Sequence, residues 1–271
     1  MLAEARFELL LNPVSLAPPA LPDGPLALVD LAAAPLGSGP GPGPPLQARL
    51  SALRDDVNSD ILLQCLSANN DRPAVNRLQD LRHSLTDRHW QWALNPAHGC
   101  HMPGPEFADC LRIVLGLPFL PGPAPCAACL GETLAPSCGH ALRCAPGECT
   151  RGHNSVRDEV LTLADSHAAL EPRGLISDDL ASRPADVLTS AALPGGRTAA
   201  LDVGIVCPDS AGAGDDCCDT MAHRKIRERA PQFPQLERQG IRYVPLTCSC
   251  YGRLHPDSAR VIDTLALAAS R

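Results

Sequence analysis

Three stretches in the first half of the chain carry apolar residues at helical spacing. In residues 46–66 an apolar side chain returns every three or four positions, with Arg and Asp between, which predicts an amphipathic helix. The same pattern predicts a second helix from Pro73 toward Trp92 and a third over residues 106–115. No arrangement of catalytic residues accompanies these segments. We therefore expect a helical region over residues 46–120.

Beyond residue 150 the pattern alternates between helix and strand. The expected elements are, in order, a helix (153–169), three strands (171–176, 183–190 and 199–206), a helix broken near Pro231 and Pro234 (221–239), a strand (241–248) and a helix (256–269). The strand 199–206 is apolar except for Asp202, as expected of a buried central strand. The order α-β-β-β-α-β-α predicts an α/β domain, residues 151–271, with one mixed sheet and flanking helices.

The first part of the chain has a different composition. Between Pro13 and Pro45 there are ten prolines and five glycines. Proline removes a backbone donor and fixes φ, so residues 1–45 are expected to form a disordered linker. The segment 121–150, between the helical region and the α/β domain, is rich in cysteine.

This cysteine-rich segment contains residues at metal-ligand spacing. The candidate ligands are Cys126, Cys129, His140 and Cys144. A Cys-x2-Cys pair followed by a His-x3-Cys pair can close a tetrahedral zinc site. Four protein ligands leave no open position, so the zinc is expected to be structural and to stabilise a segment with little core of its own. Cys138 and Cys149 are alternative ligands for one position, and a Cys-x2-Cys pair also occurs in redox proteins.

Three acids form a second candidate site. Glu171 follows the first helix of the α/β domain, Asp186 ends the segment Arg-Pro-Ala-Asp, and Asp202 lies within an apolar strand. An isolated Asp in such a strand is costly unless it is paired or metal-bound. Because a tight turn joins the strands of Asp186 and Asp202, both carboxylates are expected to meet at one end of the sheet. There they would bind Mg²⁺ or Mn²⁺ for phosphodiester hydrolysis.

The lysine usage indicates a fourth member of this site. The chain has 22 arginines and one lysine, Lys225. A compact ammonium beside the attacking water or the phosphate suits this chemistry. The position two after Asp202, where such sites often carry lysine, is Gly204, and Lys225 on the following helix is expected to fill the same space. Alternatively, Lys225 is a solvated residue of the charged run 223–229.

Together these segments resemble the C-terminal part of non-LTR retrotransposon polyproteins. There, a reverse transcriptase is followed by a CCHC zinc knuckle and a restriction-like endonuclease of the PD-(D/E)xK class. The similar segments are 92–96, 111–118, 126–129, 139–144, 151–158, 171–172, 183–186, 201–203, 225–227 and 243–246. The resemblance covers residues 46–271. It implies metal-dependent nicking of target DNA with Glu171, Asp186, Asp202 and Lys225 as catalytic residues, and element RNA as a further partner.

Two features depart from that family. An aromatic residue often follows the helix lysine by four positions, and here that residue is Arg229. No Tyr-x-Asp-Asp motif of a polymerase is present, so the chain resembles a detached fragment of such an element.

The net charge of −7 leaves other functions open, because nucleic-acid-binding proteins usually have a basic surface. One alternative is a catalytically inactive, zinc-containing remnant that still binds nucleic acid. Another is a zinc-dependent protein–protein adaptor. No apolar run is long enough to span a bilayer, and no signal segment follows Met1. We therefore expect an intracellular, nuclear location and no membrane partner.

Overall fold

The computed structural model describes residues 46–86, 102–129, 131–134, 140–144, 146–210 and 212–270. The chain divides into two units, Met1–Asn58 and Ser59–Arg271. The expected linker (residues 1–45), the predicted helical turns around Trp92, and Cys138 lie outside the described residues. No helix in the described ranges is long and apolar enough to cross a membrane.

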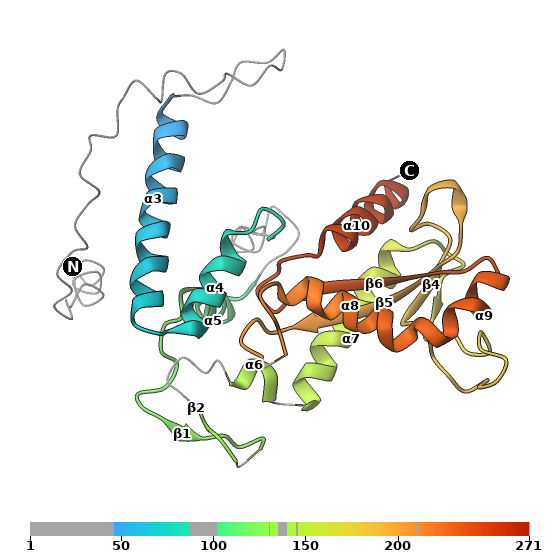
Figure 1. Cartoon of the computed structure of the whole chain (residues 1–271), viewed down its shortest axis with the longest axis horizontal. Helices are drawn as coiled ribbons and strands as arrows, with labels where there is room; N and C mark the ends of the chain where they lie inside the picture. Colours follow the sequence, from blue (N-terminus) through green and yellow to red (C-terminus); the bar gives the residue numbers. More distant parts are fainter. Residues whose placement is uncertain are drawn as a thin grey trace. The chain divides into compact units, whose positions relative to one another are not determined.

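Three helices precede the first strand: α3 (Leu46–Ala68), α4 (Arg72–Arg82) and α5 (Gly104–Leu115) (Figure 1). Helices α3 and α5 lie close to their predicted positions, whereas α4 ends at Arg82, short of the predicted course toward Trp92, and residues 83–86 are not helical. The Asp71 carboxylate accepts a hydrogen bond from the Ala74 N–H at 3.2 Å and so caps α4. Helix α5 ends at Gly116, whose φ of 66° suits glycine at a helix C-terminus. Local sequence signals thus account for the start of α4 and the end of α5.

A four-stranded mixed sheet forms the centre of the unit Ser59–Arg271. Its strands are β3 (Ala169–Leu170), β4 (Val187–Thr189), β5 (Ala199–Val206) and β6 (Arg242–Ser249), in the order β3-β4-β5-β6. The first two pairs are antiparallel, and β5 and β6 are parallel. The flanking helices are α7 (Pro146–Leu163), α8 (Cys217–Arg229), α9 (Phe233–Arg238) and α10 (Pro256–Ala269). The predicted α/β class, with a mixed sheet and flanking helices, is confirmed.

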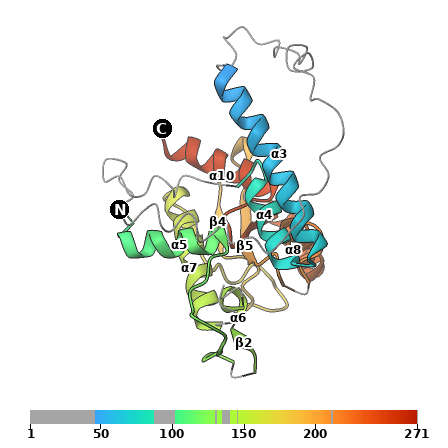
Figure 2. The same ribbon diagram turned by 90° about the vertical axis from the view of Figure 1, so that its left-hand side faces the viewer.

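The two faces of the sheet are covered by different helices, and Figure 2 shows the strands between α7 and α8. Leu201 and Val203 of β5 pack in a buried cluster with residues of α7 and α10. Ala200 packs on the opposite face, with Leu236 of α9. Side chains alternate along a strand, so Asp202 and Gly204 share the face of Ala200. That face receives α8.

Two predicted strands differ from the structure. The strand expected over 171–176 is wrong, since β3 comprises only Ala169–Leu170. Glu171 has a φ of 44°, which is outside the strand region and turns the chain. The strand expected over 183–190 is reduced to Val187–Thr189. Pro184 has no N–H to donate to a ladder, which is consistent with this shorter strand.

The predicted interruption of the helix over 221–239 is confirmed. Helix α8 ends at Arg229, a 3-10 turn covers Ala230–Gln232, and α9 begins at Phe233. Pro231 and Pro234 each remove a donor that a continuous helix would need.

A buried ion-pair network connects Asp80 of α4 with Arg253 and with Ser249 at the end of β6. Asp80 of α4 is 4% exposed, lies 2.5 Å from the Arg253 Nε and accepts a hydrogen bond from the Ser249 hydroxyl. Arg253 also donates to both carboxylate oxygens of Asp216, at 2.9 and 3.0 Å. Burial raises the pKa of Asp80, although Ser249 and Arg253 oppose the shift. Removing one partner of such a buried pair typically lowers the free energy of unfolding by about 3–5 kcal/mol.

Candidate metal centre and candidate active site

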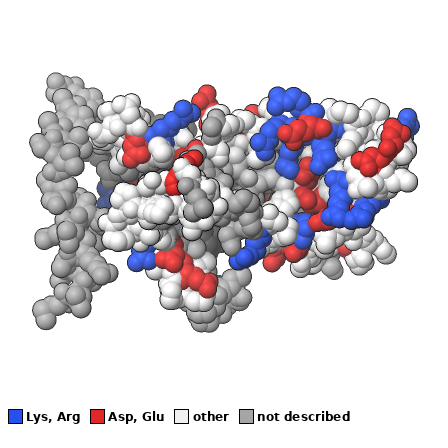
Figure 3. Space-filling model, turned by 90° about the horizontal axis from the view of Figure 1, so that it is seen from below, with Lys and Arg blue, Asp and Glu red and all other residues white. Residues whose placement is uncertain are grey.

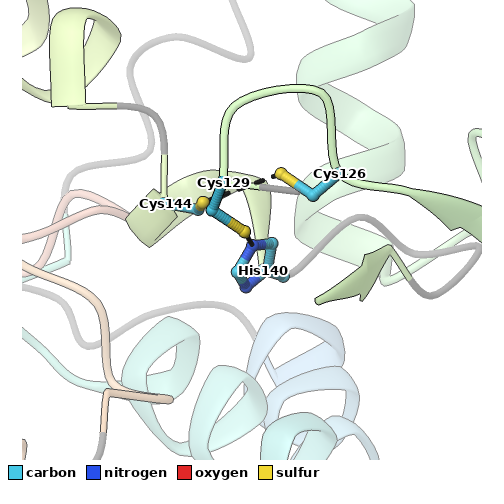
Figure 4. Close-up of side chains that lie close together, drawn as sticks. All are labelled: Cys126, Cys129, His140 and Cys144. Carbon is cyan, nitrogen blue, oxygen red and sulfur yellow. Dashed lines mark hydrogen bonds between the residues drawn. The ribbon is translucent and has the colours of Figure 1, made fainter. Parts of the chain in front are cut away.

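Four metal-ligating side chains converge between β1 and α7. Strands β1 (Ala124–Pro125) and β2 (Thr133–Leu134) form an antiparallel hairpin whose loop carries Cys126 and Cys129. Cys144 ends the short helix α6 (Ala141–Cys144), and His140 precedes it. Figure 4 shows the three thiols and the imidazole turned toward one another. Their four ligand atoms all lie within 4.8 Å of one another.

The distances fit a tetrahedral ion. Metal–sulfur bonds of about 2.3 Å and metal–nitrogen bonds of about 2.0 Å give tetrahedron edges of about 3.5–3.8 Å. The Cys126 and Cys144 sulfurs are 3.6 Å apart, and the Cys129 sulfur is 3.4 Å from the His140 Nε2. The His140 Nδ1 lies 2.8 Å from a carboxylate oxygen of Glu132, within ion-pair distance. The four predicted residues can therefore hold a metal ion.

The alternative ligands are resolved in part. Cys149 is exposed and does not belong to the group of converging ligand atoms, whereas Cys138 lies outside the described residues. Among the described residues, the Cys126–Cys144 group is the one set of three or more metal-ligating side chains that converge closely enough to hold an ion.

Backbone amides favour the thiolate form of two of these cysteines. The N–H groups of Cys129 and Ala128 lower the pKa of Cys126. The N–H of Gly131, helped by the Cys144 thiol, lowers the pKa of Cys129 to about 6. Desolvation raises the pKa of Cys144 to about 12, so without metal this thiol keeps its proton. Metal binding must release that proton, which makes the affinity pH-dependent.

The second cluster centres on Asp202, which is 6% exposed. The Lys225 Nζ lies 2.6 Å from one of its carboxylate oxygens, and the Tyr243 hydroxyl donates to the other at 2.6 Å. The Arg229 Nε is 3.8 Å from that second oxygen. Burial, followed by the charge of Asp202, raises the pKa of Tyr243 well above its ordinary value, so its hydroxyl stays a donor. Side chains from α8 and β6 thus compensate the charge of Asp202.

Lys225 reaches Asp202 by passing over Gly204. A Cβ placed on Gly204 would lie 2.5 Å from the Lys225 Cε and 3.2 Å from the Met221 Cγ. Real Cβ atoms do not approach other carbons so closely. Any larger residue at position 204 would therefore displace the lysine. The glycine two positions after Asp202 and the single lysine on α8 are complementary, as the sequence predicts.

Asp186 forms hydrogen bonds with the backbone of β5 at the residues directly before and after Asp202. Its N–H donates to the Leu201 carbonyl at 2.8 Å, and its carboxylate accepts from the Val203 N–H at 2.7 Å. The other carboxylate oxygen is 3.3 Å from the His153 Nε2 of α7. Burial would raise the pKa of Asp186, but the bonds from His153 and Val203 and the charge of Lys225 lower it. Asp186 is therefore an anion at neutral pH.

Glu171 is oriented differently from the other predicted site residues. Its N–H donates to the Asp186 carbonyl at 2.7 Å, so the backbones of the two acids are adjacent. Its carboxylate, however, pairs with Arg157 at 2.7 Å and, through its other oxygen, with Arg183. The structure pairs Lys225 with Asp202, binds Asp186 to the backbone of the two neighbours of Asp202, and places the Glu171 carboxylate between two arginines.

Sequence reasoning did not assign three residues that contact this cluster, Tyr243, Arg229 and His153. Tyr243 is one of only two tyrosines and lies on the strand parallel to β5, which was a usable signal. His153 is 33 positions before Asp186, and no spacing pattern indicates that pair.

Comparison with models of known families and with curated proteins finds no match for this chain. The functional argument therefore rests on the two clusters.

Proposed function

We propose that the chain is a metal-dependent DNA endonuclease. In this interpretation it has a restriction-like PD-(D/E)xK domain and a structural zinc knuckle, and derives from the target-nicking region of a retrotransposon. The observation that carries the proposal is the path of Lys225 over Gly204 to Asp202. The only lysine of the chain crosses the one strand position that would otherwise block it.

The donor set is compatible with a hard divalent cation. Asp186 and Asp202 offer carboxylate oxygens from neighbouring parts of the sheet, and Mg²⁺ is commonly held by one or two carboxylates together with substrate phosphate oxygens. A bound Mg²⁺ or Mn²⁺ would neutralise phosphate charge and lower the pKa of a water molecule. His153 and the Val203 N–H hold the Asp186 carboxylate in a fixed orientation.

Lys225 would act on the substrate directly. Its side chain is 15% exposed and its ammonium already lies beside Asp202, where a phosphate oxygen bound to the same site would come within its reach. Preorganised positive charge of this kind stabilises the developing charge of a phosphoryl transition state. Tyr243 and Arg229 would keep the Asp202 carboxylate oriented when the ammonium shifts toward the phosphate.

The proposal includes zinc, DNA and a nuclear location. Three thiols and one imidazole suit a tetrahedral Zn²⁺. Because these four protein ligands leave no open coordination position, the ion would be structural. Figure 3 shows Lys and Arg side chains gathered on one part of the surface, with Asp and Glu among them. Helix α8 alone carries Arg224, Lys225, Arg227 and Arg229. These cations would contact DNA phosphates, or the RNA of the element.

The test is plasmid nicking by the full chain with Mg²⁺ or Mn²⁺, with and without chelator. We expect chelator-sensitive nicking that Asp202→Ala abolishes, with an unchanged fold by circular dichroism and unchanged zinc content. Asp263→Ala is the matched control, because Asp263 is an exposed residue of α10. If Asp202→Ala nicked plasmid at the normal rate, the proposal that this site is an endonuclease active site would be wrong.

A second candidate is the inactive, nucleic-acid-binding remnant. It is favoured by the Glu171 carboxylate, which is held by Arg157 and Arg183 rather than turned to the cluster. Wild-type protein that binds DNA but gives no chelator-sensitive nicking on any DNA would establish this alternative.

A further inference from the structure

A cavity of about 530 Å³ opens beside α9 and the first residues of β6. It shares one residue with the candidate active site. Tyr243 lines the cavity, and its hydroxyl donates to Asp202 at 2.6 Å. A molecule in this cavity would thus contact the same side chain that orients the central carboxylate.

One wall of the cavity is aromatic. The rings of Phe233 and Tyr243 lie with their centroids 5.4 Å apart and their planes inclined by 34°. The whole chain has four Phe, two Tyr and two Trp, so two aromatic side chains at one cavity are a notable concentration. Aromatic rings are the platforms on which unpaired nucleobases stack, whatever the base.

Two arginines border the same cavity. Arg242 begins β6, and Arg197 precedes β5. The Arg242 N–H donates to the Thr198 carbonyl at 2.9 Å, so the two segments are adjacent. Both side chains are exposed, and in the part of the chain that the structure describes neither has an acidic partner within ion-pair distance. Two unpaired guanidiniums beside an aromatic wall suit a phosphate attached to a base.

Glu237 also lines the cavity. A carboxylate repels phosphate, but it accepts hydrogen bonds from the exocyclic amino group of a base. The cavity therefore offers a partner for each part of a nucleotide: aromatic rings and an acceptor for the base, and cations for the phosphate.

We propose that this cavity binds one unpaired nucleotide of a single-stranded DNA segment. The base packs on Phe233 and Tyr243, and its phosphate pairs with Arg197 and Arg242. The binding itself requires no metal. Its role, which rests on the proposed function, is to hold the strand next to Asp202 and Lys225 through the shared Tyr243. A nuclease with this site prefers DNA that is locally unpaired beside the cleaved bond.

The test is fluorescence anisotropy with the full chain in excess chelator, so that no cleavage occurs. The probes are a labelled single strand of about 20 nucleotides, long enough to cover such a site, and the duplex of the same sequence. We expect Arg242→Glu to weaken single-strand binding about tenfold or more, and Phe233→Leu to weaken it about fivefold or more. Arg260→Glu is the control, since it makes the same charge change at one exposed residue of α10 that does not line the cavity.

The outcomes separate the two proposals. Unchanged single-strand affinity in both cavity variants overturns the cavity site, even if the wild type nicks plasmid. An equal loss in Arg260→Glu, or an equal loss of duplex and single-strand binding in Arg242→Glu, also overturns it, because binding then depends on general charge. Selective loss in the cavity variants supports it even if no nicking is found. Melting temperatures of all variants establish that each is folded.

Discussion

The two candidate metal sites of this chain are built in opposite ways. The Cys126–Cys144 group is local, and its ligands come from a hairpin of two-residue strands and a four-residue helix. The Asp202 cluster draws on β5, β6, α7, α8 and the residue before β4, and it rests on the buried core of the sheet. In the first site an ion would hold the segment together. In the second the fold holds the side chains.

The electrostatics differ in the same sense. Without metal, Cys144 keeps its proton, and the neighbouring thiolates are favoured by backbone amides together with hydrogen bonds from Cys144 and His140. Asp202, by contrast, already has Lys225 and Tyr243 as partners, and Asp186 has His153 and the Val203 N–H. The metal-free protein should therefore retain the second site and lose the first.

The largest expected effect follows from removing a zinc ligand. Cys129→Ser should eliminate bound zinc and unfold residues 121–145, because small zinc modules are unfolded without metal. The sheet should keep its melting temperature. Metal analysis and limited proteolysis measure both effects, and Cys149→Ser, which changes an exposed cysteine outside the group, should leave zinc in place. Full zinc content in Cys129→Ser would contradict the ligand assignment.

Lys225→Ala should affect only the second site. We expect plasmid nicking to slow by about 10²–10³-fold, the usual loss when one preorganised transition-state donor is removed, with zinc content unchanged. Lys225→Arg should not restore the full rate, because a broad guanidinium does not replace a compact ammonium. Arg260, an exposed residue of α10 outside the α8 cations, provides the control, Arg260→Ala. A wild-type nicking rate in Lys225→Arg would show that the reaction requires a positive charge at this position but not the compact shape of an ammonium.

Gly204→Ala tests whether the glycine makes room for the lysine. The new Cβ would meet the Lys225 Cε at 2.5 Å, so the flexible end of the lysine side chain must move away. We expect a lower melting temperature and about tenfold slower nicking as the ammonium is displaced. The double variant Gly204→Ala/Lys225→Ala should be no slower than Lys225→Ala alone, since the two effects share one cause. Gly122→Ala, which places its Cβ in open space, should change neither quantity.

The smallest effect concerns the support of the second site and involves no metal. Asp165 accepts hydrogen bonds from the Thr189 hydroxyl of β4 and from the His167 and Ser190 N–H groups, and these lower its pKa to about 2 against the effect of burial. A lowered pKa stabilises the folded state above the unfolded value of about 4, and this contribution is lost as the pH falls toward 2.

Asp165→Asn should accordingly lower the free energy of unfolding by about 1 kcal/mol at neutral pH, after allowance for solvent screening. The difference from wild type should shrink below about pH 4 and vanish near pH 2. Urea unfolding across that range measures it, with the exposed Asp263→Asn as control. A difference that stays constant with pH would mean that ionisation of Asp165 is not the cause.

Local patterns were sufficient for much of the fold and for one site. The apolar run 199–206 and the segment 256–269 became β5 and α10 with unchanged bounds, because the spacing of apolar residues and a proline in the first turn are properties of the segment itself. The four ligands of the metal centre were predictable for the same reason. Their pairs are only three and four positions apart, so each pair is brought together by a single turn.

The sequence by itself thus determined most of the helices, the two long strands β5 and β6, the ligand spacing, and the candidacy of Asp186, Asp202 and Lys225. Only the tertiary structure decided which groups meet them. Tyr243 is 41 positions from Asp202, and His153 is 33 positions from Asp186. Whether such pairs form depends on strand register and on how helices pack over the sheet, and no periodicity encodes either. The same holds for Glu171, whose left-handed backbone and arginine partners are set by the turn after β3 and the position of α7.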